Sequence, residues 1–281
     1  YTSFKSIEKN FIGSNLSNKI YQENALYNNI VNQIFKNINY VKNKFSVIIP
    51  LFNAENLITI TLDSIYNSNT ENINFEVIII NDESTDTSVN VINNYIKQNN
   101  ITNLIVLHNK KNQGAYISRN RGIFHSTGEF IFILDSDDMI SDDRFQNDIS
   151  LFQSKDVECV ISKLIKYDYI EKTNSYKLTN EYEEFPNGKF KEISVTYKRN
   201  FFIKNGFFID SKFGSDSEFL YNKVRKSNKI NIDKLGYKAM YYSCKKNNLT
   251  TIFSRTKRIN FTIYYDACFK NNISLRHTIM V

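Results

Sequence analysis

Four short apolar runs follow one another between residues 45 and 134, and a cluster of polar residues follows each run. The runs are Phe45–Pro50, Phe75–Asn81, Leu104–Leu107 and Glu129–Leu134. Their length and their Ile, Val and Phe content are typical of strands buried on both faces. Three stretches with helical spacing, which begin near Glu55, Asp86 and Gly114, separate them. This alternation predicts an α/β fold with a mostly parallel central sheet flanked by helices.

An acidic cluster, Asp135, Asp137 and Asp138, crowds the carboxyl end of the fourth run. Like charges this close disfavour one another's ionisation, and a bound divalent cation is one explanation for keeping them together. Mg²⁺ and Mn²⁺ prefer carboxylate oxygen and share their coordination with a substrate's phosphates. Ligands of open α/β sheets bind beyond the carboxyl ends of the strands, where this cluster falls. A solvated acidic turn or the first turn of a helix explains the same residues.

The flanking parts of the chain carry weaker patterns. Residues 1–44 have apolar positions at intervals of four, which predicts an N-terminal helical extension ahead of a domain over residues 45–255. Residues 256–281 predict a C-terminal helical segment, where a further region would begin.

Residues 139–255 are less regular than the first half. Strand-like runs at Val157–Ile165 and Lys189–Tyr197 surround a segment rich in Asn, Lys, Tyr and Glu. We expect an edge strand or a hairpin there, with a variable loop over 166–188. Gly214–Leu220 is typical of a loop that enters a helix, and Lys238–Tyr242 predicts a short strand.

The net charge of +7 over 281 residues suits a nucleotide substrate, a nucleic acid or an anionic membrane surface, and charge alone does not choose among them. Cys159, Cys244 and Cys268 lie far apart without metal-ligand spacing, which is typical of free thiols in a reducing compartment. No apolar run reaches the roughly 18–20 residues that span a bilayer. These features predict a cytoplasmic protein with peripheral contact at the inner face of the cell membrane. Because the sequence starts at Tyr1, we expect it to be part of a longer chain.

Four motifs that follow one another between residues 45 and 140 resemble the family 2 glycosyltransferases, which have the Rossmann-like GT-A fold. They are Ser46–Glu55, Asn81–Asp86, Asn112–Gly122 and Glu129–Asp138. The second is similar to the family's Asp-Gly-Ser-x-Asp turn, the third to its Asn-x-Gly-x-x-x-Ala-Arg-Asn-x-Gly, and the fourth to the strand that ends in Asp-x-Asp. Each motif alone is weak, and their shared order carries the resemblance.

Three positions within these four motifs depart from the family's pattern, and Ser215 further along the chain stands where the family commonly has Glu. Phe52 stands at the usual Tyr, Glu83 at the usual Gly and Ser118 at the usual Ala. The change at Glu83 puts the local backbone in doubt, because glycine adopts conformations that other residues avoid.

The resemblance implies a nucleotide-sugar donor and a set of residues that bind it. Pro50, Phe52 and Glu55 would wall the base and ribose pocket, and Asp82 would accept a hydrogen bond from the base, which is uracil in most relatives. Asn112, Gly114, Arg119 and Asp135 would line the pocket near the diphosphate and sugar. Asp137, with Asp135, would hold Mn²⁺ or Mg²⁺ between the two phosphates. Ordinary packing, a turn cap or a solvated arginine would explain these residues one at a time.

Inverting transfer also needs a base that takes the proton of the acceptor hydroxyl. Gly214-Ser215-Asp216-Ser217-Glu218 is similar to the family's acidic segment, which implies Asp216 as the base and Glu218 as the alternative. A helix N-cap explains Asp216 equally simply. Lys245 lies where relatives carry a basic loop over the diphosphate, and a solvated basic turn is the other explanation. Many relatives have a histidine metal ligand near here, and this sequence has none at that place.

The resemblance therefore implies an inverting glycosyltransferase that moves a sugar, hexosyl or N-acetylhexosaminyl, from a UDP-sugar to a glycan or lipid-linked acceptor in bacterial surface polysaccharide synthesis. The alternative is a non-catalytic GT-A module that binds nucleotide sugars within a larger enzyme. A nucleotidyltransferase would need a Gly-rich N-terminal loop that is missing here. A nucleic acid partner has only net charge in its favour, so we expect none.

Overall fold

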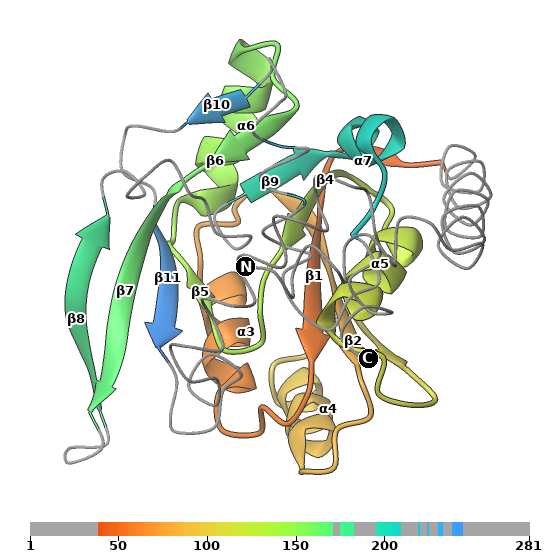
Figure 1. The fold of residues 1–281 in the computed structure, drawn as a ribbon, viewed down its shortest axis with the longest axis vertical. Helices are drawn as coiled ribbons and strands as arrows, with labels where there is room; N and C mark the ends of the chain where they lie inside the picture. Colours follow the sequence, from red (N-terminus) through yellow and green to blue (C-terminus); the bar gives the residue numbers. More distant parts are fainter. Residues whose placement is uncertain are drawn as a thin grey trace, which may run out of the picture.

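The computed structural model describes residues 39–170, 175–182, 195–208, 230–232 and 238–243, together with the single positions 219 and 224. Its centre is a seven-stranded sheet with the order β10-β6-β9-β4-β1-β2-β3 (Figure 1). The strands are β1 (Val41–Leu51), β2 (Asn74–Asn81), β3 (Leu104–His108), β4 (Gly128–Ile133), β6 (Cys159–Ile161), β9 (Val195–Lys198) and β10 (Ile230–Ile232). The four apolar runs form its parallel part, which confirms the expected α/β fold.

Helices cover both faces of this sheet. They are α3 (Ile58–Tyr66), α4 (Ser88–Gln98), α5 (Ala115–His125), α6 (Arg144–Ser154) and α7 (Arg199–Asn205). Successive residues of a strand point to opposite faces. Val47 and Ile49 therefore pack with α3, α4 and α6 in one apolar core, and Ile48 packs with α5 and α7 in the other. The helices expected near Glu55, Asp86 and Gly114 begin at Ile58, Ser88 and Ala115, whereas α6 was not predicted.

Helix α5 lies unusually close to the sheet at Gly122. A Cβ atom added there would lie 2.4 Å from Ile48 Cγ2 and 2.7 Å from Ile80 Cδ1, well inside normal contact distance. The missing side chain therefore sets the separation between α5 and strands β1 and β2, and with it the position of the N-terminus of α5.

Pro50 lies inside β1 rather than closing it, because the strand continues to Leu51. The carbonyl of Ile48 accepts a hydrogen bond from Leu134 N at 3.0 Å, so Ile48 faces β4. Hydrogen-bonding direction alternates along a strand, so Pro50 faces the same side, where pairing with β4 has already ended at Ile48 and Ile133. A residue without an N–H is tolerated there.

Strand β9 is inserted into the sheet with the opposite direction. It pairs antiparallel with β4 and with β6, so the two strand-like runs at 157–165 and 189–197 do pair as a hairpin would. The prediction of an edge strand is wrong, because β9 lies between β4 and β6 and the edge strand is β10. Val195, Thr196 and Tyr197 are fully buried, as this interior place requires.

A second, four-stranded sheet has the order β5-β11-β7-β8. Its strands are β5 (Met139–Ile140), β7 (Lys163–Ile170), β8 (Ser175–Tyr182) and β11 (Lys238–Ser243). In Figure 1, β7, β8 and β11 stand beside the main sheet. The loop predicted over 166–188 is therefore wrong for its first part, where β7 and β8 form a hairpin. The tyrosines of these two strands favour β-structure, but the Lys and Asn residues between them led to the prediction of a loop. The strand predicted at Lys238–Tyr242 is confirmed.

A buried ionic network joins α6 to β6 and β9. The guanidinium of Arg144 donates to Asp148 Oδ2 at 2.7 Å, to Ser162 Oγ at 2.6 Å and to Thr196 Oγ1 at 2.8 Å. The Thr196 hydroxyl donates to the same oxygen of Asp148. The ring of Phe132 lies 4.5 Å from Arg144 Cζ, and both charged residues are fully buried. Buried charges need such partners.

At the amino edge of the sheet, Glu76 collects four donors. Its carboxylate accepts from Ser46 Oγ at 2.6 Å, from Lys44 Nζ at 2.9 Å, and from the backbone N and hydroxyl of Thr127 at 2.6 and 3.0 Å. Burial acts to raise the pKa of Glu76, but these hydrogen bonds and the charge of Lys44 outweigh it and hold the pKa below its usual 4.5. The charged form thus stabilises the junction of β1, β2 and β4.

Because the folded pKa is depressed, this stability should be fully present above about pH 4.5 and lost as the pH falls through the lower, folded pKa. Glu76→Gln should lower the free energy of unfolding at pH 7 by about 2 kcal/mol. The difference from the unmodified protein should shrink as the solution is acidified. Urea unfolding at several pH values measures this. Glu71→Gln, the same change at an exposed position, should alter neither the free energy of unfolding at pH 7 nor its dependence on pH. An equal effect of both variants would contradict the role of Glu76.

Some expectations lie outside the described residues. These are the helix expected within residues 1–38, the helical segment expected over 256–281, and the loop and helix expected over 214–220, apart from Phe219. The expected extension ended at residue 44, but Val41–Lys44 already belong to β1. Within the ranges that are described, no helix combines the length and apolar character needed to cross a membrane.

Candidate functional site

The carboxyl ends of the four parallel strands meet at one edge of the main sheet (Figure 1). The strand order reverses there, because β2 lies on one side of β1 and β4 lies on the other. Ligands of open α/β sheets bind at such a switch point. Short segments follow the strand ends at 52–57, 82–87, 109–114 and 134–138. The predicted site residues between Pro50 and Asp137 lie in these segments, in α5 or at the end of β1.

Asn53 ties together the segments that follow β1 and β2. Its φ of 51° is left-handed, which Asn tolerates better than most residues. Its Oδ1 accepts from the backbone N of Thr85 at 2.8 Å and of Asp86 at 3.3 Å, and its own N donates to Ser84 Oγ at 3.1 Å. Asn53 belongs to the first sequence motif, but its bracing role was not predicted, because its partners lie more than thirty residues away.

Two carboxylates reinforce this connection. Asp86 accepts from the backbone N of Glu55 at 3.1 Å and from the N and hydroxyl of Ser88. Burial acts to raise the pKa of Asp86, but these hydrogen bonds outweigh it and keep the pKa below its usual 3.8. Glu55 Oε2 in turn accepts from the N of Thr87 at 2.8 Å and from its hydroxyl at 2.5 Å. Glu55 therefore braces the segment after β2, and its contact with a ligand stays a prediction.

Phe52 is 50% exposed, one of the few large apolar side chains left in solvent among the described residues. It directly follows β1 at the switch point, whereas Pro50, two residues earlier, is buried. An exposed ring in this place can stack against a flat base. The roles of Phe52 and Pro50 in a base pocket stay predictions.

The buried carboxylate of Asp82 organises the segment that follows β3. Its Oδ1 accepts from Asn109 Nδ2 at 2.6 Å and from Gln113 N at 2.8 Å, and its Oδ2 accepts from Gly114 N at 2.7 Å. Gly114 has φ 89° and ψ 161°, a conformation essentially limited to glycine. A carboxylate offers about four acceptor positions, and donors among the described residues occupy three of those of Asp82.

The departure at Glu83 leaves the backbone in the conformation that glycine would adopt. Glu83 has φ 63°, which costs roughly 1–2 kcal/mol for a residue with a Cβ. Its side chain offsets part of this cost, because Glu83 Oε2 accepts from Asn112 N at 2.8 Å. Asn112 Nδ2 also donates to the backbone O of Asp82 at 3.0 Å. The turn therefore has a left-handed residue at the usual glycine position although that residue is a glutamate.

Ser118, which stands at the usual alanine, also has a partner. It is fully buried, and its hydroxyl accepts from Asn109 Nδ2 at 2.9 Å. Arg121 Nη1 donates to Asn109 Oδ1 at 2.6 Å, so Asn109 joins α5 to Asp82. Sequence reasoning missed Asn109 because it lies between the recognised motifs. The only signal was a polar residue immediately after a strand.

Arg119 connects α5 to the acidic turn. Its side chain is only 4% exposed, and its Nη2 donates to Asp135 Oδ1 at 2.7 Å, whereas Asp135 is 42% exposed. The rings of Tyr116 and Phe208 lie 5.3 and 5.7 Å from the guanidinium carbon. The structure thus brings together two predicted donor contacts that lie 16 residues apart in the sequence.

Helix α3 holds the acidic turn in place. Thr61 Oγ1 donates to the backbone O of Ser136 at 3.0 Å, and Asp138 N donates to the backbone O of Asp135 at 3.1 Å. Asp138 is buried, while Asp137 is partly exposed. Asp135 and Asp137 are therefore the two carboxylates of this cluster that solvent reaches, and their roles at a metal ion stay predictions.

Asp135 and Asp137 fit a hard divalent cation by the chemistry of their donor atoms. Mg²⁺ keeps several waters and is commonly bound by one or two carboxylates plus substrate phosphates. Across the described ranges, no three His, Cys, Asp or Glu side chains are placed to share one metal ion. A pair of carboxylates completed by a diphosphate is thus the arrangement that these residues could provide.

The predicted base Asp216, its alternative Glu218 and the predicted diphosphate contact Lys245 lie outside the described residues. Their roles stay predictions from the sequence. Phe219, the neighbour of Glu218, is described and fully buried.

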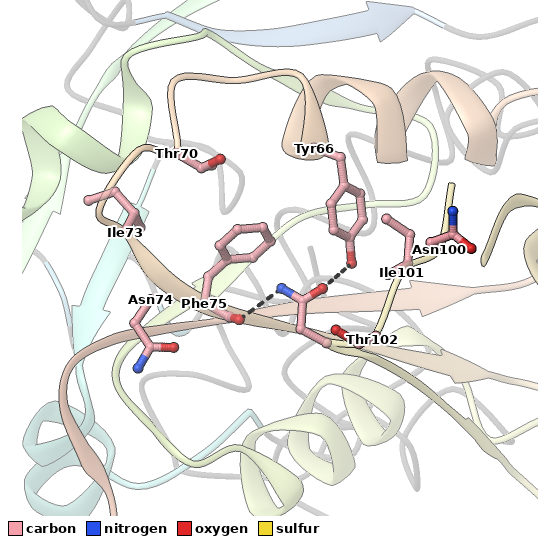
Figure 2. A pocket seen from close by; sticks show the side chains of 9 residues that line it. Tyr66, Thr70, Ile73, Asn74, Phe75, Asn100, Ile101 and Thr102 are labelled. Atoms are coloured by element: carbon pink, nitrogen blue, oxygen red, sulfur yellow. Dashed lines mark hydrogen bonds between the residues drawn. The ribbon is translucent and has the colours of Figure 1, made fainter. Parts of the chain in front are cut away.

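A groove of about 470 Å³ lies at the opposite edge of the sheet, between the C-terminus of α3 and the amino ends of β2 and β3. Figure 2 shows Tyr66 and Phe75 among the residues that line this groove. The Tyr66 hydroxyl donates to Asn103 Oδ1 at 3.1 Å, and Asn103 Nδ2 donates to the backbone O of Phe75 at 3.0 Å. Both ends of this amide are therefore used within the protein, and the groove is separate from the switch point.

Comparison with known proteins follows the same segments. The family model described as "Glycosyl transferase family 2" matches residues 46–220. The minor teichoic acid biosynthesis protein GgaB of Bacillus subtilis is 31% identical over 147 residues, which are 52% of this chain and 16% of GgaB. The chain spans less than half the length of the first curated relatives it matches.

Solved structures share the fold. The crystal structure of S. aureus TarS 1-349 in complex with UDP-GlcNAc matches with a TM-score of 0.60 and 21% identity, over 75% of this chain and 62% of that one. The mannosyltransferase PcManGT from Pyrobaculum calidifontis, in complex with GDP-Man and Mn²⁺, matches with a TM-score of 0.57 and 16% identity, over 79% of this chain and 65% of that one.

Proposed function

The chain belongs to glycosyl transferase family 2, and from this premise we propose that it is an inverting glycosyltransferase that uses a UDP-sugar. The observation that carries the proposal is the grouping at the switch point. The exposed ring of Phe52 follows β1 at this point, the buried carboxylate of Asp82 follows β2 on one side, and Asp135, which accepts from Arg119, follows β4 on the other. This order matches a ligand with a base at one end and a diphosphate at the other.

Each half of the donor would have its own contacts. Phe52 would stack on the base, and the remaining acceptor position of Asp82 would receive a base N–H. Arg119, whose planar fork suits phosphate oxygens, would face the diphosphate from α5. Asp137, with Asp135, would hold Mn²⁺ or Mg²⁺. When bound, the metal ion neutralises charge that develops on the leaving diphosphate.

The reaction also needs a base on the acceptor side. An acceptor hydroxyl would attack the anomeric carbon, its proton would pass to the Asp216 carboxylate, and the bond from that carbon to the phosphate oxygen would break. Attack from the side opposite the leaving group inverts the anomeric configuration. Asp216 is assigned by its sequence motif, and Glu218 is the alternative.

The acceptor class is supported by the relatives. GgaB is named for teichoic acid biosynthesis. We therefore place the acceptor among bacterial surface polymers, as a glycan or lipid-linked chain. The net charge of +7 suits a polyanionic acceptor or an anionic membrane. Location in the cytoplasm at the membrane's inner face stays a prediction.

Two measurements separate an enzyme from a non-catalytic binding module. Calorimetry should show that UDP binds in the presence of Mn²⁺ and more weakly without it, and incubation with UDP-sugars should release UDP slowly even without an acceptor. GDP serves as the control nucleotide. If the protein binds UDP but cleaves none of the UDP-sugars, it is the non-catalytic binding module. A protein that binds no nucleotide would contradict both functions.

A further inference from the structure

One face of α5 holds a distant segment of the chain. Tyr116, Asn120 and Phe124 are spaced by four residues and so lie along one side of the helix. The rings of Phe124 and Phe207 lie 4.8 Å apart, and those of Tyr116 and Phe208 lie 6.3 Å apart. Between these ring pairs, Asn120 Nδ2 donates to the backbone O of Phe208 at 2.8 Å. Asn120 Oδ1 accepts from the backbone N of the same residue at 3.0 Å.

The primary amide of Asn120 makes both of these bonds at once, one through its donor and one through its acceptor. An aspartate would accept from Phe208 N but would repel Phe208 O, and an apolar residue would remove the partner of both backbone groups, which is destabilising when they are buried. Asn120 is only 4% exposed. The residue type at this position is therefore fixed by the backbone of Phe208, 88 residues further along the chain.

The segment reaches α5 because α7 ends abruptly. Gly206, the C-cap of α7, has φ 81°, and its N donates to the backbone O of Phe202 at 2.8 Å. This left-handed conformation favours glycine at a helix end. The turn at Gly206 directs Phe207 and Phe208 onto the helix that carries Arg119.

The ring of Phe208 contacts both Arg119 and Phe219. Its ring is 5.7 Å from Arg119 Cζ on one side. On another side its ring is 4.5 Å from that of Phe219, the residue that follows the predicted base segment. Arg119 in turn donates to Asp135. A chain of contacts thus runs from Asn120 through Phe208 to Arg119 and the acidic turn.

We infer that Asn120 is a positioning residue for the nucleotide site: it fixes Phe208 against the guanidinium, so that Arg119 faces the diphosphate while it remains bonded to Asp135. The inference rests on the proposed function, because Arg119 has a nucleotide to face only if that function holds. It adds to it a residue that touches neither donor nor acceptor.

A double-mutant cycle tests this, because a residue that acts through another loses its effect when the other is changed. Calorimetry would measure UDP binding with Mn²⁺ for the unmodified protein, Asn120→Ala, Arg119→Lys and the double variant. Asn120→Ala alone should weaken UDP binding about tenfold, and in the Arg119→Lys background less than about twofold. Phe208→Leu keeps the backbone bonds to Asn120 but removes the ring, so it should weaken UDP binding as much as Asn120→Ala does in each background. It replaces Asn120→Ala in the cycle if that variant does not fold.

Asn205→Ala is the matched control, since Asn205 Nδ2 also donates to a backbone carbonyl, that of Phe201 in its own helix at 2.9 Å. It should leave UDP binding unchanged. Equal losses in both backgrounds, or no loss on changing Asn120 or Phe208, would overturn the inference and leave the proposed function standing. An unmodified protein that fails to bind UDP would overturn both.

Discussion

Replacing Asp137 by asparagine should lower the rate of sugar transfer by about a hundredfold or more, equivalent to at least about 2.7 kcal/mol of transition-state stabilisation. The reason is the loss of a charged oxygen ligand to the metal ion, since the amide keeps the size of the side chain but binds a divalent cation more weakly. Steady-state rates at rising Mn²⁺ concentration measure this. The variant should need far more Mn²⁺ for half-maximal rate, while its melting temperature stays close to that of the unmodified protein.

Asp142→Asn provides the matched control for this change. It removes the same charge from an exposed carboxylate five residues further along the chain, so it should leave both the rate and the Mn²⁺ requirement unchanged. Near-normal turnover of the Asp137 variant at ordinary Mn²⁺ concentration would remove Asp137 from the metal site. A loss of equal size in both variants would point instead to a general effect of charge.

The largest loss of stability should come from the buried pair in α6. Arg144→Leu leaves the Asp148 carboxylate in an apolar environment without its main cation, and breaking a buried pair from one side costs about 3–5 kcal/mol. Chemical unfolding of the variant measures this free energy. The double variant Arg144→Leu and Asp148→Leu should lose clearly less than the sum of the two single variants, because it leaves no isolated charge.

The ion pair of Lys204 with Glu158 gives the comparison. Lys204 is 60% exposed, and exposed pairs contribute about 1 kcal/mol or less. Lys204→Ala should therefore change the free energy of unfolding only slightly. An Arg144→Leu variant as stable as Lys204→Ala would show that the network contributes no more than an exposed pair.

Sequence patterns were sufficient for the parallel half of the sheet. Strands buried on both faces are continuous apolar runs, so β1, β2, β3 and β4 stand out from their surroundings. Their order also fixes which ends carry polar residues, and Phe52, Asp82, Arg119 and Asp135 were assigned to one site on that basis together with the family resemblance. The structure places these residues at a single edge, 16 to 83 residues apart in the sequence.

The remaining features depend on partners that no local pattern reveals. Arg144 and Arg199 look like ordinary surface charges in the sequence, since arginine is rarely buried. Both are almost completely buried. Arg199 donates to the backbone O of Gly128 at 2.9 Å and of Ser126 at 2.7 Å, 71 and 73 residues away. Burial lowers the pKa of Arg199 to about 10, so it remains charged at neutral pH. The roles of Asn109 and Asn120 were missed for the same reason.

The cross-connected segments beyond β1, β2 and β3 have a thermodynamic consequence. Asn53, Asp82 and Asn109 hold these segments together through the protein's own hydrogen bonds, so their conformational entropy is lost when the chain folds. The binding of a ligand to the folded protein therefore needs little further ordering of these segments, so the entropic cost of binding is small. Removing one of these hydrogen bonds would increase the conformational entropy of the segments in the folded protein. We expect the affinity for a ligand to fall more than the free energy of unfolding.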